Sequence, residues 1–216
     1  NQYLQHQEIK RWGEEYFDDV ISRLIQWGVK GLCWGGREST LNLRLAWANR
    51  MAAMAGIQTA IVTNGVNFEA TPDLFESLLL CNWVGVSVDT TKPEVYKTVR
   101  GTDDCDKVWK NIERLGKHKI TTTVSARALI LPETWSGLYD VAYRARESGC
   151  NFVLIRPADL SRQDLHIYQR KDIPVEQAKE VLEKCHELET KDFGVFTIFH
   201  KYADDFKVTH KFKKCL

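Results

Sequence analysis

The sequence predicts an α/β protein built on a parallel sheet. Short apolar runs alternate with amphipathic segments through the middle of the 216-residue chain. The apolar runs are continuous, which is typical of strands covered on both faces. Their alternation with helical segments suits βαβ units. A barrel and an open doubly wound sheet both fit this order of elements.

The predicted order is one helix, then five repeats of a strand and a helix, then a last strand. Gly28 ends the first helix and Gly56 the second, because glycine readily follows a helix. Thr71 and Pro72 supply an N-cap and a first-position proline for the third. Pro157 ends the fifth strand because proline has no backbone N–H for further pairing.

These signals give the bounds of the elements. The expected helices cover residues 14–27, 41–55, 73–80, 93–99 with 106–115, 133–147 and 175–188. The expected strands cover residues 29–34, 57–63, 83–88, 120–131, 152–155 and 193–199. The first helix has no strand before it, so we expect a further strand upstream of Asn1. The long connection 158–174 has a length often found in lids and substrate loops.

The composition excludes several classes of protein. Hydrophobic residues make up 44% and charged residues 27% of the chain, as in a soluble globular domain. The net charge of +1 does not indicate a nucleic-acid-binding surface. No apolar run is long enough for a membrane span, and no secretory leader is visible. The six cysteines are too widely spaced for a local metal motif, so we expect a reducing, cytoplasmic setting.

Polar residues and glycines gather where successive strands are expected to end. In parallel α/β folds these carboxyl ends meet at one edge, where ligands bind. Gly35-Gly36-Arg37-Glu38 follows the first strand, and Asn64 follows the second. Ser87 and Asp89 share one face at the end of the third. Each group alone also fits a turn or a helix cap, but their succession predicts a binding rim.

Other catalytic motifs are missing from the sequence. It contains no GxSxG nucleophile elbow, no HExxH zinc motif and no phosphate-binding P-loop. The histidines are scattered, which favours surface or structural roles over metal ligation.

Four motifs in sequence order resemble those of radical S-adenosylmethionine (SAM) enzymes. Residues 35–42 read GGRESTLN and resemble the GGGEPTLN stretch of that family. Residues 62–65, VTNG, match its TNG landmark, and residues 86–101 resemble its SxD and YxxxRG segment. Residues 155–157 resemble its sixth-strand segment. The resemblance covers residues 16–160.

This resemblance implies a partial (β/α)6 barrel of the TIM type. Members of the family hold a [4Fe–4S] cluster through a CxxxCxxC motif, and SAM binds to that cluster. Reductive cleavage of SAM yields a 5′-deoxyadenosyl radical that removes a hydrogen atom from a substrate. The resemblance also implies an electron donor such as a flavodoxin or a ferredoxin. The substrate and the catalytic residues are not indicated, and neither a membrane nor a nucleic acid is expected as partner.

The sequence departs from the family pattern in two places. The CxxxCxxC motif is absent and, by resemblance, would lie upstream of Asn1 together with the missing strand. We therefore expect residues 1–206 to be a radical SAM core that lacks its N-terminal segment and that, alone, binds no cluster and is inactive. Arg37 and Ser39 replace a glycine and a proline of the motif, whereas Glu38 is kept. Two effects of Arg37 are open from the sequence: it crowds the site, or it pairs with Glu38 and weakens its role.

The first two motifs imply contacts with the amino group of SAM. By resemblance, the backbone of Gly35 and Gly36 and the carboxylate of Glu38 receive the methionine ammonium. Carbonyl and carboxylate oxygens suit a cation. Asn64 is expected to brace the rim.

The later motifs imply contacts with the rest of SAM. By resemblance, Ser87 and Arg100 contact the methionine carboxylate and the ribose region, and Asp89 supports the ribose side. An arginine suits a carboxylate because its guanidinium can bind both oxygens. The segment containing Arg156 and Pro157 is expected to lie along the adenine, mostly through its backbone.

The end of the chain and the choice of function leave alternatives open. Residues 207–216 are expected to form a tail. Its Cys215 is a candidate first ligand of an auxiliary cluster in a following domain, or simply a surface cysteine. Besides a radical SAM enzyme, the sequence allows a SAM- or nucleotide-binding barrel without a cluster, and a plain α/β protein whose motif matches are chance.

Overall fold

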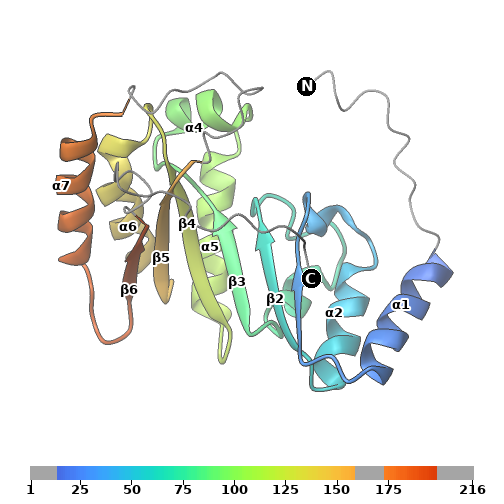
Figure 1. Ribbon diagram of the computed structural model, residues 1–216. Coiled ribbons are helices and arrows are strands. Elements are labelled where there is room, and N and C mark those ends of the chain that lie inside the picture. Colours follow the sequence, from blue (N-terminus) through green and yellow to red (C-terminus); the bar gives the residue numbers. More distant parts are fainter. Residues whose placement is uncertain (1–13, 159–172, 199–216) are drawn as a thin grey trace, which may run out of the picture.

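The computed structural model describes residues 14–158 and 173–198, and it contains one six-stranded parallel sheet (Figure 1). The strands lie side by side in chain order. They are β1 (Gly31–Trp34), β2 (Gln58–Thr63), β3 (Trp83–Ser87), β4 (Thr123–Ile130), β5 (Phe152–Pro157) and β6 (Gly194–Thr197). The predicted α/β fold with a parallel sheet in chain order is confirmed. The sheet is a partial barrel that stays open.

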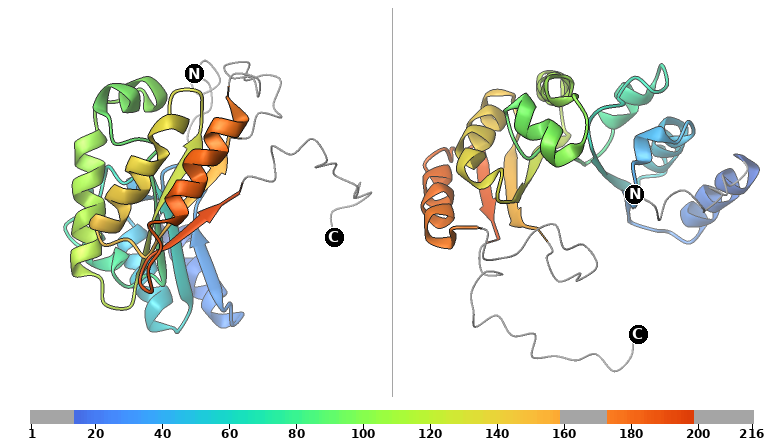
Figure 2. Two further views of the ribbon diagram at one scale, coloured as in Figure 1. Left: turned by 90° about the vertical axis from the view of Figure 1, so that its left-hand side faces the viewer. Right: turned by 90° about the horizontal axis from the view of Figure 1, so that it is seen from above.

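The helices cover the convex side of the curved sheet (Figure 2). They are α1 (Glu14–Gln26), α2 (Leu45–Met54), α3 (Leu74–Leu78), α4 (Pro93–Arg100), α5 (Cys105–His118), α6 (Leu138–Glu147) and α7 (Val175–His186). Two short 3₁₀ turns, η2 (Ser39–Leu41) and η3 (Trp135–Gly137), precede α2 and α6. Within the described ranges, no helix has the length and apolar character needed to cross a membrane.

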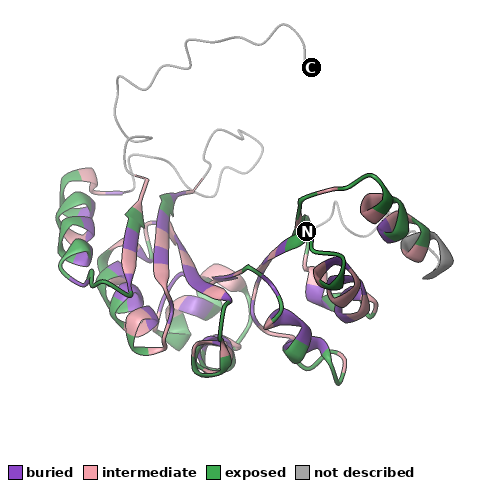
Figure 3. Ribbon diagram, turned by 90° about the horizontal axis from the view of Figure 1, so that it is seen from below, coloured by how far each residue is buried: buried purple, intermediate pink, exposed green. Residues whose placement is uncertain are grey.

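The core lies between the sheet and these helices. Every second residue of each central strand points into it, including Val84, Val86, Val124, Ala126 and Val153, all of them fully buried. Buried and less buried residues accordingly alternate along β2 and β5, whereas Gly85 of β3 and Ser125 of β4 are buried as well (Figure 3). The residues between them point to the concave side, which the helices leave uncovered.

We call this concave side the open face and define it by the register of the strands. Residues paired across parallel strands share a face, so one row runs from Cys33 through Ala60 and Trp83 to Thr123. Further residues of the open face are Val62, Gly85, Ser87, Ser125, Arg127, Leu129, Phe152, Leu154, Arg156 and Phe196.

Some predicted element ends are wrong. Thr71 does not cap α3, because its carbonyl accepts from the N–H of Leu74 in a preceding turn and Asp73 occupies the N-cap. The helix expected at 41–55 begins only at Leu45, because the side chain of Asn42 accepts from the N–H of Arg44 and holds a turn there. β5 continues to Pro157, whose missing N–H does not prevent it from being the last residue paired with β4.

Two glycines bring α5 and the end of α6 into backbone contact at the amino ends of β4 and β5. A Cβ on Gly116 would overlap the carbonyl oxygen of Ser148 and lie 3.0 Å from the Cα of Gly149. Gly149 has a φ of +78°, which glycine adopts without strain. Only glycine fits this contact.

Three predictions fall outside the residues that the structure describes. The further strand upstream of Asn1 stays a prediction. Most of the long connection 158–174 and the whole of the tail 207–216, with Cys215, lie outside the described residues.

Candidate functional site

Glu38 ties β1 to β2 at the carboxyl end of the sheet. Its Oε1 accepts from the N–H of Thr40 at 3.2 Å and from the hydroxyls of Thr40 and Thr63 at 2.6 and 2.7 Å. Its Oε2 accepts from the N–H of Asn64 at 2.7 Å. A carboxylate oxygen offers about two lone-pair sites, so Oε2 has room for a second donor.

Asn64 forms the turn that follows β2. Its side-chain oxygen accepts from the N–H of Val66 at 2.9 Å, while its own N–H binds Glu38. Gly65 follows with a φ of +76°, and a Cβ there would lie 2.5 Å from Val86. Asn64 is therefore held in the rim by its own turn and by Glu38.

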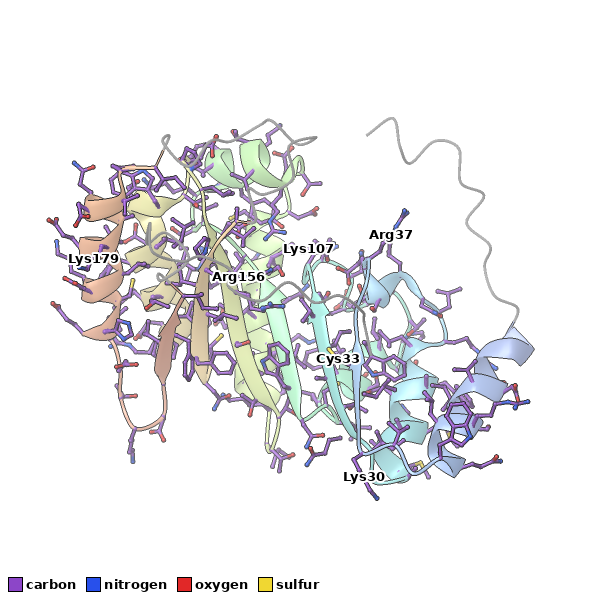
Figure 4. All side chains as sticks on the ribbon, viewed as in Figure 1. Lys30, Cys33, Arg37, Lys107, Arg156 and Lys179 are labelled. Atoms are coloured by element: carbon purple, nitrogen blue, oxygen red, sulfur yellow. The ribbon has the colours of Figure 1, made fainter. Side chains whose placement is uncertain are left out.

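The glycines after β1 border open space. Gly36 has a φ of +105°, and a Cβ on Gly35 or on Gly36 would meet no atom within 4 Å. A hollow of about 360 Å³ lies here, with Cys33, Gly35 and Glu38 in its lining. The exposed Arg37 points outward beyond the strand ends (Figure 4) and makes no ion pair with a described residue. The pairing of Arg37 with Glu38 is not formed.

Asp89 and Arg100 form a buried ion pair above β3 and β4. The Oδ2 of Asp89 lies 2.6 Å from Nη2 of Arg100, and its Oδ1 accepts from the N–H of Leu129 at 2.8 Å. Only 2% of the Asp89 side chain is exposed, against 27% for Arg100. Burial raises the pKa of the Asp89 carboxyl above its ordinary value, and the charge of Arg100 opposes that rise. A ligand that binds Arg100 must share its guanidinium with Asp89.

The remaining predicted residues separate onto two faces. Ser87 is half-buried on the open face, in register with Arg127 of β4. Arg156 is exposed on the same face (Figure 4). Pro157 is buried on the helix side, because it follows Arg156 in the alternation of β5 and pairs with the core residue Ile130. The side chain of Pro157 therefore lies on the opposite face of the sheet from Ser87 and Arg156, and only its backbone borders the rim.

Arg127, which the sequence reading missed, lies among these residues on the open face. Its Nε is buried and has no hydrogen-bond partner within the described part of the chain. Burial lowers the pKa of Arg127, and the neighbouring charge of Arg156 lowers it further. The sequence carried a signal, because Thr123, Ser125 and Arg127 place polar residues at every second position of an otherwise apolar strand.

The cysteines give no metal site of their own. Cys33 is exposed, whereas Cys81, Cys105, Cys150 and Cys185 are buried with free thiols. Across residues 14–158 and 173–198, no three histidine, cysteine or carboxylate side chains converge as metal ligands would.

Sequence comparison identifies one family. The family model described as the radical SAM superfamily matches residues 10–145. No curated protein matches the chain.

Solved structures of similar fold include proteins that bind S-adenosylmethionine. SuiB of Streptococcus suis, bound to S-adenosylmethionine, has a TM-score of 0.66 at 11% identity, over 89% of this chain and 46% of SuiB. The protein anSMEcpe, with bound AdoMet and a peptide, has a TM-score of 0.60 at 16% identity, over 81% and 51%. A domain of the pyruvate-formate lyase-activating enzyme of Bacteroides vulgatus has a TM-score of 0.53 at 12% identity, over 78% and 98%. The chain thus spans less than half the length of SuiB.

Proposed function

The chain belongs to the radical SAM superfamily, whose family model matches more than half of it, and we propose that it is the core of an enzyme that binds SAM and uses it for radical chemistry. In this proposal SAM is cleaved reductively at a [4Fe–4S] cluster. The resulting 5′-deoxyadenosyl radical acts on a substrate held over the open face.

One observation carries the proposal. Acceptors for a cation and donors for an anion lie at the same edge of the sheet, at the ends of neighbouring strands. The free acceptor site on Oε2 of Glu38, with the unhindered backbone of Gly35 and Gly36, suits an ammonium group. Ser87 and Arg100 suit a carboxylate. SAM carries both groups on its methionine end, so it matches this edge in charge.

Two further contacts follow from the same placement. Asp89 holds the guanidinium of Arg100 in place and is therefore a positioning residue for the ligand of Arg100. Asp89 is also proposed to contact the ribose of SAM. The backbone of Arg156 and Pro157 is proposed to lie along the adenine. The side chain of Pro157, buried on the helix side, takes no part.

The cluster needs ligands that the described residues do not supply. We propose that a CxxxCxxC motif upstream of residue 1 holds it, that residues 1–206 form the core, and that residues 207–216 with Cys215 lead into a further domain. A flavodoxin or ferredoxin is the proposed electron donor. The buried free thiols of the core suit a reducing compartment such as the cytoplasm. In this proposal, the present chain alone is inactive.

Binding of SAM to this chain tests the first half of the proposal. Titration calorimetry with Ser87→Ala should show binding weaker by about ten- to a hundredfold, because a lost hydrogen bond to a charged group costs about 1.5–3 kcal/mol. Ser87 suits this test because it ends a strand and its removal leaves the rim turns intact. Ser136→Ala, at an exposed position in η3, is the matched control and should bind SAM as the unchanged chain does.

Cleavage of SAM tests the second half. A longer gene product that contains CxxxCxxC, reconstituted with iron and sulfide without oxygen, should release 5′-deoxyadenosine and methionine on reduction. The same preparation of the present chain should release neither. A longer product that binds SAM but forms no 5′-deoxyadenosine would support a SAM-binding barrel without radical chemistry.

A further inference from the structure

We propose that Arg127 and Arg156 bind an oxyanion of the substrate, a carboxylate or a phosphate, while a flat apolar part of the same substrate rests on Trp83 and Phe152. The proposal names a substrate class for the function above and rests on it. Its two arginine side chains lie on the open face level with the rim assigned to SAM, because Arg127 is in register with Ser87, and its aromatic rings lie further toward the amino ends of the strands.

The register of β4 and β5 brings the two arginines together. Arg127 pairs with Leu154 and Arg156 pairs with Leu129, so the arginines share the open face and lie diagonally across neighbouring strands. Diagonal neighbours on one face have Cα atoms about 7–8 Å apart, which is within reach of two long side chains. Their charges interact strongly enough for Arg156 to lower the pKa of Arg127.

This pair of cations lacks a compensating carboxylate on the sheet. No Asp or Glu occurs in the described strands β1 to β6. Asp89, above them, lies within the influence of Arg156, whose charge opposes the rise that burial causes in the pKa of that carboxyl, but its oxygens are bound to Arg100 at 2.6 Å and to the N–H of Leu129. Three other arginines also keep a buried Nε without a partner, but each of them is paired with a carboxylate, namely Arg44, Arg50 and Arg100. Arg127 has no such pair with a described residue, which points to a missing acceptor. An oxyanion supplies both the negative charge and the oxygen atoms that the guanidinium groups need.

Aromatic rings form the surface below the arginines. Trp83 and Phe152 are stacked with their centroids 6.4 Å apart and their planes 15° apart. The indole N–H of Trp83 donates to Ser125 at 2.8 Å, which fixes the ring. Phe196, 56% exposed, meets Phe152 edge to face. Trp83 and Phe152 are half-buried and Phe196 is exposed, so aromatic surface lies beside the cations and suits a ligand that is apolar and flat at one end and negative at the other.

Gly85 allows this arrangement to form. A Cβ at this position would lie 2.7 Å from the ring of Trp83 and 2.9 Å from Cδ of Arg127. Both side chains therefore fold over the bare backbone of β3, and the guanidinium of Arg127 stands over the indole at 5.7 Å from its centroid. The cation and the ring are positioned before any ligand arrives.

Small aromatic anions test the inference. Phenyl phosphate and benzoate combine an aromatic ring with one of the two oxyanions. Phenol carries the ring alone, and inorganic phosphate carries the oxyanion alone. We expect ligand-observed NMR to show binding of at least one aromatic anion and much weaker binding of phenol and phosphate. Comparison of the two aromatic anions shows which oxyanion the site prefers.

Arginine variants link that binding to the site. Arg127→Gln and Arg156→Gln should each weaken binding of the preferred anion about tenfold, as expected for loss of a charge-assisted hydrogen bond. Arg146→Gln removes an arginine on α6 outside the open face and should leave binding unchanged. Arg156 is exposed, so its substitution is not expected to unfold the chain, and circular dichroism checks each variant.

Competition with SAM separates this inference from the proposed function. Binding of the anion that persists at saturating SAM supports a separate substrate site. Displacement by SAM would assign the arginines to SAM and overturn the inference, as would equal binding by Arg127→Gln and the unchanged chain. A failure of SAM to bind, with anion binding intact, would count against the proposed function alone.

Discussion

Arg100 and Arg127 are both partly buried arginines next to β3 and β4, but their surroundings are opposite. Arg100 meets the carboxylate of Asp89 at 2.6 Å, and that carboxylate also binds β4 through Leu129. Both arginines keep a buried Nε without a hydrogen-bond partner, but Arg127 has no ion pair with a described residue, and burial and the like charge of Arg156 lower its pKa. The pair of Arg100 and Asp89 joins α4, the end of β3 and β4. Arg127 and Arg156 are two positive charges without a carboxylate in the described strands. The difference indicates which cation holds the fold and which is available to a ligand.

Removal of Asp89 should give the largest loss of stability. In Asp89→Ala, Arg100 loses its partner and the N–H of Leu129 loses its acceptor, so we expect the free energy of unfolding to fall by about 3 kcal/mol. Urea denaturation followed by circular dichroism measures this. Asp103→Ala breaks the exposed pair with Lys97 and should cost less than about 1 kcal/mol. Equal losses in the two variants would mean that the Asp89 pair does not hold the fold.

Glu38→Ala should cost less than Asp89→Ala. The substitution leaves the N–H of Asn64 and the hydroxyl of Thr63 without their acceptor, which we expect to cost about 2 kcal/mol. Part of the loss is recovered because water reaches this half-buried rim. The same denaturation measurement applies, with Glu69→Ala, an 81% exposed partner of Arg114, as control. A loss no greater than that of the control would contradict a structural role for Glu38.

Arg127→Met should change stability in the opposite direction. It removes a partly buried charge beside a like charge and keeps an apolar chain over Gly85, so we expect a gain of about 1 kcal/mol. Thermal unfolding without ligand measures it. The same variant should lose the stabilisation that an aromatic anion gives to the unchanged chain. A loss of stability like that of Asp89→Ala would show that Arg127 also holds the fold.

Thiol labelling of the native chain should distinguish the cysteine of the open face from the cysteines of the core. This prediction involves no change in the stability of the chain. Burial raises the pKa of Cys81 to about 11 and that of Cys150 and Cys185 to about 12, so these thiols stay protonated and unreactive at pH 8. Their protection should persist as the pH rises to about 10. Iodoacetamide should label the exposed Cys33 of the native chain, and Cys33→Ser should carry one label fewer by mass spectrometry. Labelling of Cys150 before Cys33 would contradict the assignment of faces.

The sequence predicts the fold well because the alternation of strands and helices is local. It also predicts that Glu38, Ser87 and Arg156 gather at one side of the sheet, because each follows or ends a strand. The pairing of Arg100 with Asp89 was not predictable, since it depends on how α4 returns over β3. Arg127 was missed because it lies inside a strand and not at its end. Its spacing of two residues from Ser125 indicates that both side chains lie on the same face of the sheet.

The contact between Gly116 and Gly149 has a consequence for how the open face can evolve. It sets how closely the two chain segments that enter β4 and β5 can approach, and these strands carry Arg127 and Arg156. A larger residue at either glycine would wedge the entrances apart and spread the arginines, although both substitutions lie on the far side of the sheet. Selection for a ligand of fixed size would then act on Gly116 and Gly149, which do not touch the ligand. A new distance between the charges of Arg127 and Arg156 would be reached by mutation in the helical layer.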